Sequence, residues 1–150
     1  TRQKIMKDSR LGSFGVLALI IVFMLKFLLL SGLEHPLALA CGLISCLSLG
    51  RFSILLLVNY SDLSKQAGLT KHLKKVSRKT IILCGMFSML WVIPAGLFAI
   101  IFMIIFGYAS IFFFTKFVVP FNRGLSGDIL GLYVVFVELS SLLILTASFS

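Results

Sequence analysis

Acidic residues are scarce in this 150-residue chain. Asp and Glu together number 5, against 14 Lys and Arg, and charged residues of both signs make up only 13% of the sequence. Apolar residues account for 59%, and the mean hydropathy is +1.11. A soluble core of this length cannot bury so large an apolar share, so a lipid solvent is the simplest explanation.

The sequence also lacks a CxxC cysteine motif and a signal peptide. Cys41, Cys46 and Cys84 lie in apolar runs without a CxxC spacing, which favours small buried hydrophobes over disulfides or a metal site. Residues 1–10 are polar and basic, with neither an initiator methionine nor the apolar region of a signal peptide. We expect the sequence to begin inside a longer protein.

Long apolar stretches dominate the rest of the chain. A bilayer core about 30 Å thick requires roughly 20 apolar residues in helical form. Such stretches occupy residues 14–33, 36–60, 81–119 and 128–149. The third is about twice the length of one span, and Pro94 and Gly96 mark the best place for it to turn. We therefore expect an all-α, polytopic integral membrane protein of about five transmembrane helices, forming a single transmembrane domain over residues 1–150.

The basic residues test this threading, because Lys and Arg concentrate in cytoplasmic loops. Five spans put three polar segments on one face, and these segments hold Arg2, Lys4, Lys7, Arg10, Lys65, Lys71, Lys74, Lys75, Arg78, Lys79, Lys116 and Arg123. The opposite loops contain Glu34 with His35, and the turn around Pro94. We expect a bacterial or archaeal plasma membrane protein with its N-terminus and basic loops in the cytoplasm. The net charge of +9 is then explained by topology, and no nucleic-acid partner is expected.

Two polar motifs lie on the face assigned to the cytoplasm. Lys7-Asp8-Ser9-Arg10 precedes the first span, and Ser126-Gly127-Asp128 opens the last, where Asp128 complements the positive end of the helix. Phosphoryl chemistry needs cations or helix N-terminal amides for anionic oxygens, and carboxylates for magnesium. The alternative is that both motifs only anchor the protein to lipid headgroups.

Three ionisable residues lie inside predicted spans, where they are costly and therefore candidates for function. Arg51 lies about 14 Å from the cytoplasmic end of its helix, and Glu138 about 15 Å from Asp128 in its own. The matching depths predict a buried pair between Arg51 and Glu138. Lys26 is somewhat deeper, and it either snorkels or competes for the same carboxylate. A structural link between helices and a catalytic role both remain open for this group.

The motifs resemble those of a known family. Residues 5–12 read Ile-Met-Lys-Asp-Ser-Arg-Leu-Gly, which is similar to a stretch of the cobalamin synthases, also called adenosylcobinamide-GDP ribazoletransferases. Gly50-Arg51 continues the likeness in the second span. Residues 126–131, followed by Glu138 and Leu139, resemble the C-terminal signature of the same family. The similarity covers nearly all of the chain.

The resemblance implies a membrane transferase that joins adenosylcobinamide-GDP to α-ribazole or its 5'-phosphate and releases GMP, in the last steps of cobalamin biosynthesis. It implies Mg²⁺ as the cofactor. The residues it assigns are Asp8 and Asp128 as catalytic residues and metal ligands, and Lys7, Ser9, Arg10, Arg51, Ser126, Gly127 and Glu138 as substrate-binding residues. The lipid bilayer is the other expected partner, and a homo-oligomer is one alternative for the assembly.

The departures from the family pattern are equally specific. Arg123-Gly124 stands where the family usually has paired glycines, and Val135 stands where it has a second glutamate. Family members also carry an upstream acidic motif resembling a magnesium site, which this chain lacks, so the chain is either a fragment or a truncated, inactive version. The alternative function is a small transporter or structural membrane protein with a polar path through Lys26, Arg51 and Glu138. Transporters tend to show internal repeats, and this sequence shows none.

Overall fold

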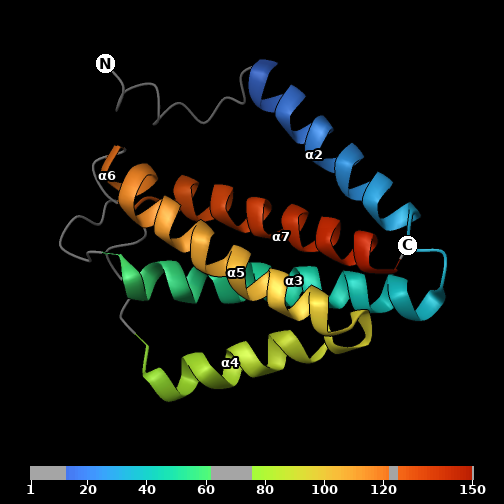
Figure 1. Ribbon diagram of the computed structural model, residues 1–150. Coiled ribbons are helices and arrows are strands. Elements are labelled where there is room, and N and C mark those ends of the chain that lie inside the picture. Colours follow the sequence, from blue (N-terminus) through green and yellow to red (C-terminus); the bar gives the residue numbers. More distant parts are fainter. Residues whose placement is uncertain (1–12, 62–75, 122–124, 150) are drawn as a thin grey trace.

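The described part of the polypeptide folds into a bundle of helices (Figure 1). The computed structural model describes residues 13–61, 76–121 and 125–149, and these residues form helices and no strand. In chain order the elements are α2 (Ser13–Ser31), α3 (Pro36–Tyr60), α4 (Arg78–Leu90), η3 (Ile93–Ala95), α5 (Leu97–Phe113), η4 (Phe114–Val118), α6 (Val119–Phe121) and α7 (Gly127–Phe149). The prediction of an all-α fold is confirmed.

Four helical segments of the described chain are long and apolar enough to cross a bilayer. They are Ser13–Ser31, Pro36–Tyr60, Leu97–Val118 and Gly127–Phe149. The remaining predicted helix, α4, has 13 residues, which corresponds to about 20 Å of helix. It is shorter than one span because Ser77 caps its start at the edge of a basic segment and a turn ends it before Pro94. The protein is a polytopic membrane protein with about five helices, of which α4 is the short one.

The predicted turn between α4 and α5 is confirmed. Pro94 lies in the short 3₁₀ turn η3, and Gly96 follows with a φ of +92°. Proline ends a helix because it lacks an N–H, and glycine adopts a positive φ without a Cβ penalty. α4 runs antiparallel to the second half of α3, as shown by hydrogen bonds from Val76 N to Asn59 Oδ1 (3.0 Å) and from Ser88 Oγ to Ser48 O (3.4 Å).

α3 and α7 lie side by side at the centre of the bundle. The buried face of α3 is built of small residues, which let two helix backbones approach closely. A Cβ on Gly42 would lie 2.6 Å from Leu33 Cδ1, and a Cβ on Gly50 would lie 2.7 Å from Glu138 Cγ. Leu142 of α7 is fully buried against this face. The close approach of α3 to α7 therefore depends on the absence of a side chain at Gly50, whereas Gly42 makes room for Leu33, which precedes α3.

The end of α5 widens into a π-helical turn, η4, immediately before Pro120. Proline clashes with the carbonyl four residues earlier in a regular helix, so a wider turn at this point accommodates Pro120. Phe114 in η4 is buried, and it stacks on Tyr133 of α7 with ring centroids 4.5 Å apart. Together with Leu57, Leu125 and other apolar residues, these rings join the ends of α3 and α5 to the start of α7.

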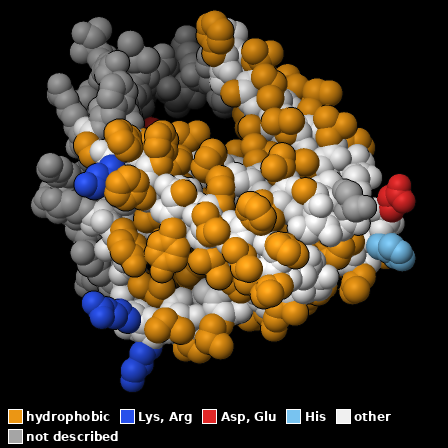
Figure 2. Space-filling model, viewed as in Figure 1, with side chains coloured by type: hydrophobic (Ala, Val, Ile, Leu, Met, Phe, Trp, Pro, Cys, Tyr) orange, Lys and Arg blue, Asp and Glu red, His pale blue; other side chains and the backbone are white. Residues whose placement is uncertain are grey.

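α2 lies at the edge of the bundle, inclined to α7 (Figure 1). None of its residues is buried within the described part of the chain. Near its C-terminal end, Leu29 O accepts a hydrogen bond from Thr146 Oγ1 at 3.1 Å. Large apolar side chains are exposed along α2, α4 and α5, and they cover most of the face shown in Figure 2. Such a surface is stable when the surrounding solvent is lipid.

Candidate functional site

The first turn of α7 presents an exposed carboxylate beside backbone amides. α7 begins at Gly127, as predicted, and Asp128 in its first turn is exposed. Ser126 precedes the helix, and its Oγ accepts a hydrogen bond from Ile129 N at 3.4 Å. Outside its chain neighbours and the backbone of its own helix, no described atom lies within 4 Å of the position that a Cβ on Gly127 would occupy. The described residues therefore leave the backbone of this turn accessible to an anionic group from outside.

Packing holds this turn in place from the inside. Leu125 and Ile129 are buried among residues of α3, η4 and α7, with Leu125 fully enclosed. The first amides of a helix have no partner within the helix, and together with the helix dipole they favour an anion. A fixed helix N-terminus with one exposed carboxylate is chemically suited to hold a phosphate and to orient a hydroxyl or a cation.

The second polar group lies inside the bundle, where Glu138 forms two ion pairs. Its Oε2 is bound by Lys26 Nζ of α2 and its Oε1 by a guanidinium nitrogen of Arg51 in α3. The Glu138 side chain is 5% exposed, whereas those of Lys26 and Arg51 are 26% and 63% exposed. The predicted pair between Arg51 and Glu138 is confirmed. Lys26 shares the carboxylate, so one anion holds two cations from two different helices.

Gly50 provides the space for this group. A Cβ at position 50 would lie 2.7 Å from Glu138 Cγ and 2.9 Å from Glu138 Oε1. A carboxylate held at both oxygens cannot easily move aside. Gly50 is therefore part of the ion-pair site, because its missing side chain lets Glu138 of α7 reach Arg51, the next residue of α3.

The structure keeps these two polar groups apart. Asp128 and Glu138 are separated by about 15 Å along α7. Among the described residues, the ion pairs join Glu138 to Lys26 and Arg51 and do not include Asp128. The remaining sequence-predicted site residues, Lys7, Asp8, Ser9 and Arg10, lie outside the described residues. Their meeting with the start of α7 stays a prediction.

Comparison with known proteins adds the family. The family model described as cobalamin-5-phosphate synthase matches residues 1–146. The chain belongs to the cobalamin-5-phosphate synthase family. A curated relative, the adenosylcobinamide-GDP ribazoletransferase of Desulfitobacterium hafniense (strain Y51), is 34% identical over 154 aligned residues. No solved structure matches the chain.

The alignment covers 97% of this chain and 58% of the relative from D. hafniense. The chain thus spans little more than half the length of that synthase. The family match includes both residues 7–10 and the first turn of α7, so the two motifs named from the sequence lie within the region that defines membership.

Magnesium at Asp128 stays a prediction, and an exposed carboxylate is compatible with it. Mg²⁺ prefers oxygen donors and is commonly held by one or two carboxylates together with substrate phosphates and water. Among the described residues, no group of three or more His, Cys, Asp or Glu side chains comes together as a metal site. Asp128 alone would therefore be one ligand of such a metal, and Asp8, the second predicted ligand, lies outside the described residues.

Two features of this region go beyond the sequence prediction. The sequence left open whether Lys26 snorkels or shares the Glu138 carboxylate, and the structure shows that it shares it. The π-helical turn η4 was not predicted, although Pro120 within an apolar helix is a signal for it. Both features depend on how the helices lie in space as well as on sequence spacing.

Proposed function

We propose that this chain is the C-terminal membrane part of an adenosylcobinamide-GDP ribazoletransferase. The proposal rests on one observation: a chain of the synthase family holds an exposed Asp128 in the first turn of α7, at the N-terminal end of that helix. In the proposed reaction, a ribose hydroxyl of α-ribazole or its 5'-phosphate attacks the phosphorus that carries cobinamide. The new P–O bond forms as the bond to GMP breaks, the hydroxyl proton passes to a base or to water, and GMP leaves.

The chain's own residues would perform the positioning that such a displacement requires. The amides of the first turn bind a phosphate oxygen, Asp128 accepts a hydrogen bond from the attacking hydroxyl, and Ser126 keeps the turn in shape through its bond to Ile129 N. Lys7, Ser9 and Arg10 bind the diphosphate, and Arg51 and Glu138 support the site from the bundle interior. Mg²⁺, held by Asp128 and Asp8, would neutralise charge on the phosphates when bound.

We further propose that the basic end of the bundle faces the cytoplasm. Arg78 and Lys79 begin α4, and Lys116 lies in η4. The apolar cluster that joins the ends of α3 and α5 to the start of α7 shows that these elements meet at the same end. The positive-inside rule supports a cytoplasmic position for that end, in a bacterial or archaeal plasma membrane.

An activity assay on the full-length enzyme containing this segment tests the proposal. Asp128→Asn keeps the size and helix-capping ability of the side chain and removes its charge, so GMP release from adenosylcobinamide-GDP and α-ribazole should fall by at least about a hundredfold. Asp128→Glu should give a partial loss. Gly131→Ala, one turn further along α7 and in open space, is the control and should keep full activity.

Retention of most activity by Asp128→Asn at saturating Mg²⁺ would show that Asp128 only caps the helix. Unfolding in detergent, measured on each variant, separates a lost function from a lost fold. An inactive variant with unchanged unfolding supports the proposed role.

A further inference from the structure

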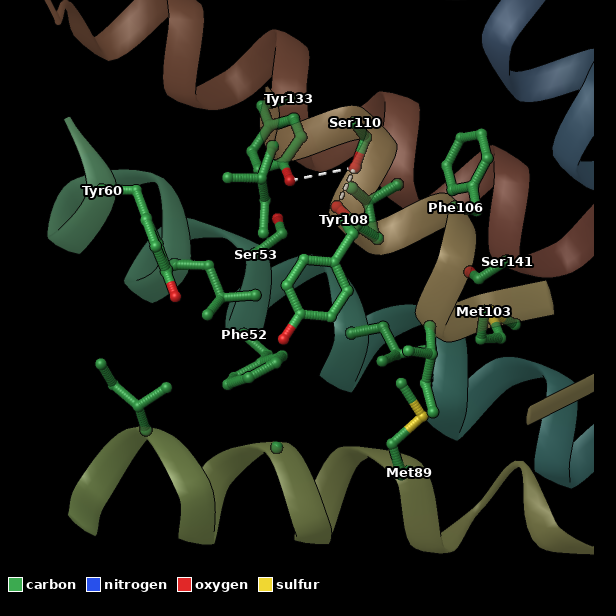
Figure 3. Close-up of a pocket in the computed structure, with 18 of the residues that line it drawn as sticks. Phe52, Ser53, Tyr60, Met89, Met103, Phe106, Tyr108, Ser110, Tyr133 and Ser141 are labelled. Carbon is green, nitrogen blue, oxygen red and sulfur yellow. Dashed lines mark hydrogen bonds between the residues drawn. The ribbon is translucent and has the colours of Figure 1, made fainter. Parts of the chain in front are cut away.

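A cleft of about 750 Å³ lies between α3, α4 and α5, with residues of α7 also in its lining (Figure 3). Glu138 and its two cations are not among the lining residues. Its lining is predominantly apolar, with Phe52 from α3, Met89 from α4 and Met103 from α5 among the residues that form it. Exposed side chains of α4 and α5, including Met86 and Tyr108, flank it. The cleft is therefore open at the surface of the bundle that faces lipid.

The buried hydroxyls of this cleft already have partners. Ser53 Oγ donates to Gly50 O at 2.7 Å, and Ser141 Oγ donates to Glu138 O at 2.9 Å. Ser110 Oγ bonds to Gly107 O at 2.9 Å and lies 3.2 Å from Tyr133 Oη, the contact dashed in Figure 3. An occupant thus needs no polar groups at this depth, which favours a hydrocarbon chain over a nucleoside base.

The length of the cleft also suits a hydrocarbon chain. Its lining runs along α3 from Leu49 to Tyr60 and along α5 and η4 from Met103 to Thr115. These stretches correspond to about 16–18 Å of helix. The two helices run in opposite directions, so Tyr60 and Thr115 lie together at one end of the cleft, where Ile81 of α4 also lines it.

Cations lie around that end. Arg78 and Lys79 immediately precede the lining residues of α4 and are exposed. Lys116 follows Thr115, and its Nζ lies 5.5 Å from the centroid of the Phe112 ring, which also lines the cleft. Lys and Arg at the membrane surface attract anionic lipid headgroups by about 1 kcal/mol each, or about fivefold in affinity. The described charges at this rim are all positive.

We propose that the cleft between α3, α4 and α5 binds an acyl chain of an anionic phospholipid, whose phosphate lies at the end of the cleft that carries Arg78, Lys79 and Lys116. The apolar depth of the cleft takes the chain and the cationic rim selects the headgroup. The site is separate from the first turn of α7 and does not depend on the proposed transferase activity.

Quenching of a single tryptophan by brominated lipid tests this site. Trp91 is the only tryptophan of the chain, so Trp91→Phe combined with Phe52→Trp places the one fluorophore in the cleft. The control carries Phe27→Trp, also with Trp91→Phe, on the exposed surface of α2. Each protein is reconstituted in phosphatidylcholine vesicles with increasing fractions of brominated phosphatidylglycerol, and the quenching gives the affinity of phosphatidylglycerol relative to phosphatidylcholine at that tryptophan.

We expect this relative affinity to be at least about fivefold in the cleft and near unity on α2. Neutralising the rim with Arg78→Gln, Lys79→Gln and Lys116→Gln should bring the cleft value close to that of α2. Gly107→Leu should reduce quenching in the cleft, because Gly107 lines it and no described atom lies within 4 Å of a Cβ there. Gly131→Leu is its control outside the cleft.

Three results would overturn the proposal. Equal relative affinities in the cleft and on α2 would exclude headgroup selection, as would a preference that survives neutralisation of the rim. Quenching that Gly107→Leu leaves unchanged would place the lipid elsewhere. Absence of quenching in the cleft, with normal quenching on α2, would mean that protein rather than lipid fills it.

Discussion

Gly50→Ala is the change that tests the Glu138 ion-pair site most directly. The added Cβ would lie 2.7 Å from Glu138 Cγ and 2.9 Å from Oε1. Carbon atoms in contact normally stay about 3.5–4.0 Å apart, so α3 and α7 must separate or Glu138 must move by about 1 Å. Overpacking of this kind costs about 1–3 kcal/mol.

Gly131→Ala supplies the matched comparison. Both glycines lie in helices, and both substitutions gain about 1 kcal/mol of helix propensity. Outside its chain neighbours and its own helix backbone, a Cβ at Gly131 meets no described atom within 4 Å. Gly131→Ala should therefore show the gain in helix propensity without an overpacking cost. The difference in unfolding free energy between the two variants should therefore equal the overpacking cost of about 1–3 kcal/mol. Equilibrium unfolding in mixed detergent micelles measures this difference.

A double-mutant cycle identifies Glu138 as the cause. Glu138→Ala removes the Cγ, Cδ and Oε1 atoms that the new Cβ would contact. Gly50→Ala should therefore lose its overpacking penalty in the Glu138→Ala background. The expected interaction energy is about 1–3 kcal/mol, well above the roughly 0.5 kcal/mol scatter of independent sites. Additive effects, or a Gly50→Ala variant as stable as Gly131→Ala, would refute the claim that Gly50 makes room for the carboxylate.

Two further predictions concern the charges. Glu138→Gln should destabilise the protein in the same unfolding assay, because Lys26 and Arg51 lose their partner. The cost should stay below the roughly 3–5 kcal/mol of a fully buried pair, since these two side chains are 26% and 63% exposed. Lys26→Met should cost less, since Arg51 still pairs with Glu138, and it should partly rescue Glu138→Gln. In a variant without native cysteines, Ser13→Cys and Lys71→Cys should react with an impermeant thiol reagent from the same side of sealed vesicles, and Glu34→Cys from the other. Labelling of Ser13→Cys and Lys71→Cys from opposite sides would contradict the proposed threading.

The parts of the fold that the sequence predicts are those governed by local rules. Apolar length marks the long helices, Pro94 and Gly96 mark the turn, and Ser126 with Asp128 marks the start of α7. The pairing of Arg51 with Glu138 was also accessible, because two antiparallel helices of known ends place these residues at matching depths. A charged side chain inside a membrane span needs a partner of opposite charge, and this requirement leaves few possible partners for Glu138.

The remaining features depend on helix orientation and could not be read from spacing. Lys26 reaches Glu138 because α2 is inclined to α7 (Figure 1). The cleft between α3, α4 and α5 arises because α4 packs along the second half of α3 while α5 packs more closely on α7. α4 is short because the basic segment limits its start and the turn at Pro94 limits its end. The length of an apolar stretch alone does not determine where it divides into two helices.

α7 is one continuous helix from Gly127 to Phe149. It therefore connects its first turn, which carries Asp128, to the ion pairs of Glu138. Gly50→Ala can be relieved in two ways: Glu138 swings away from its two cations, or α7 shifts against α3. The first response would leave the buried Glu138 carboxylate without its two cations, so a shift of the helix is the cheaper response.

Such a shift would be passed along α7 to Asp128, and a misplacement of about 1 Å can cost a hundredfold in rate. The buried Leu125 and Ile129 oppose the movement and make it smaller. We therefore expect Gly50→Ala to lower the turnover of the full-length enzyme by about tenfold or more while Gly131→Ala keeps it, with both variants assayed below their unfolding temperatures. Normal turnover in Gly50→Ala would show instead that the Glu138 side chain yields alone, and that the position of Asp128 is independent of the ion pairs.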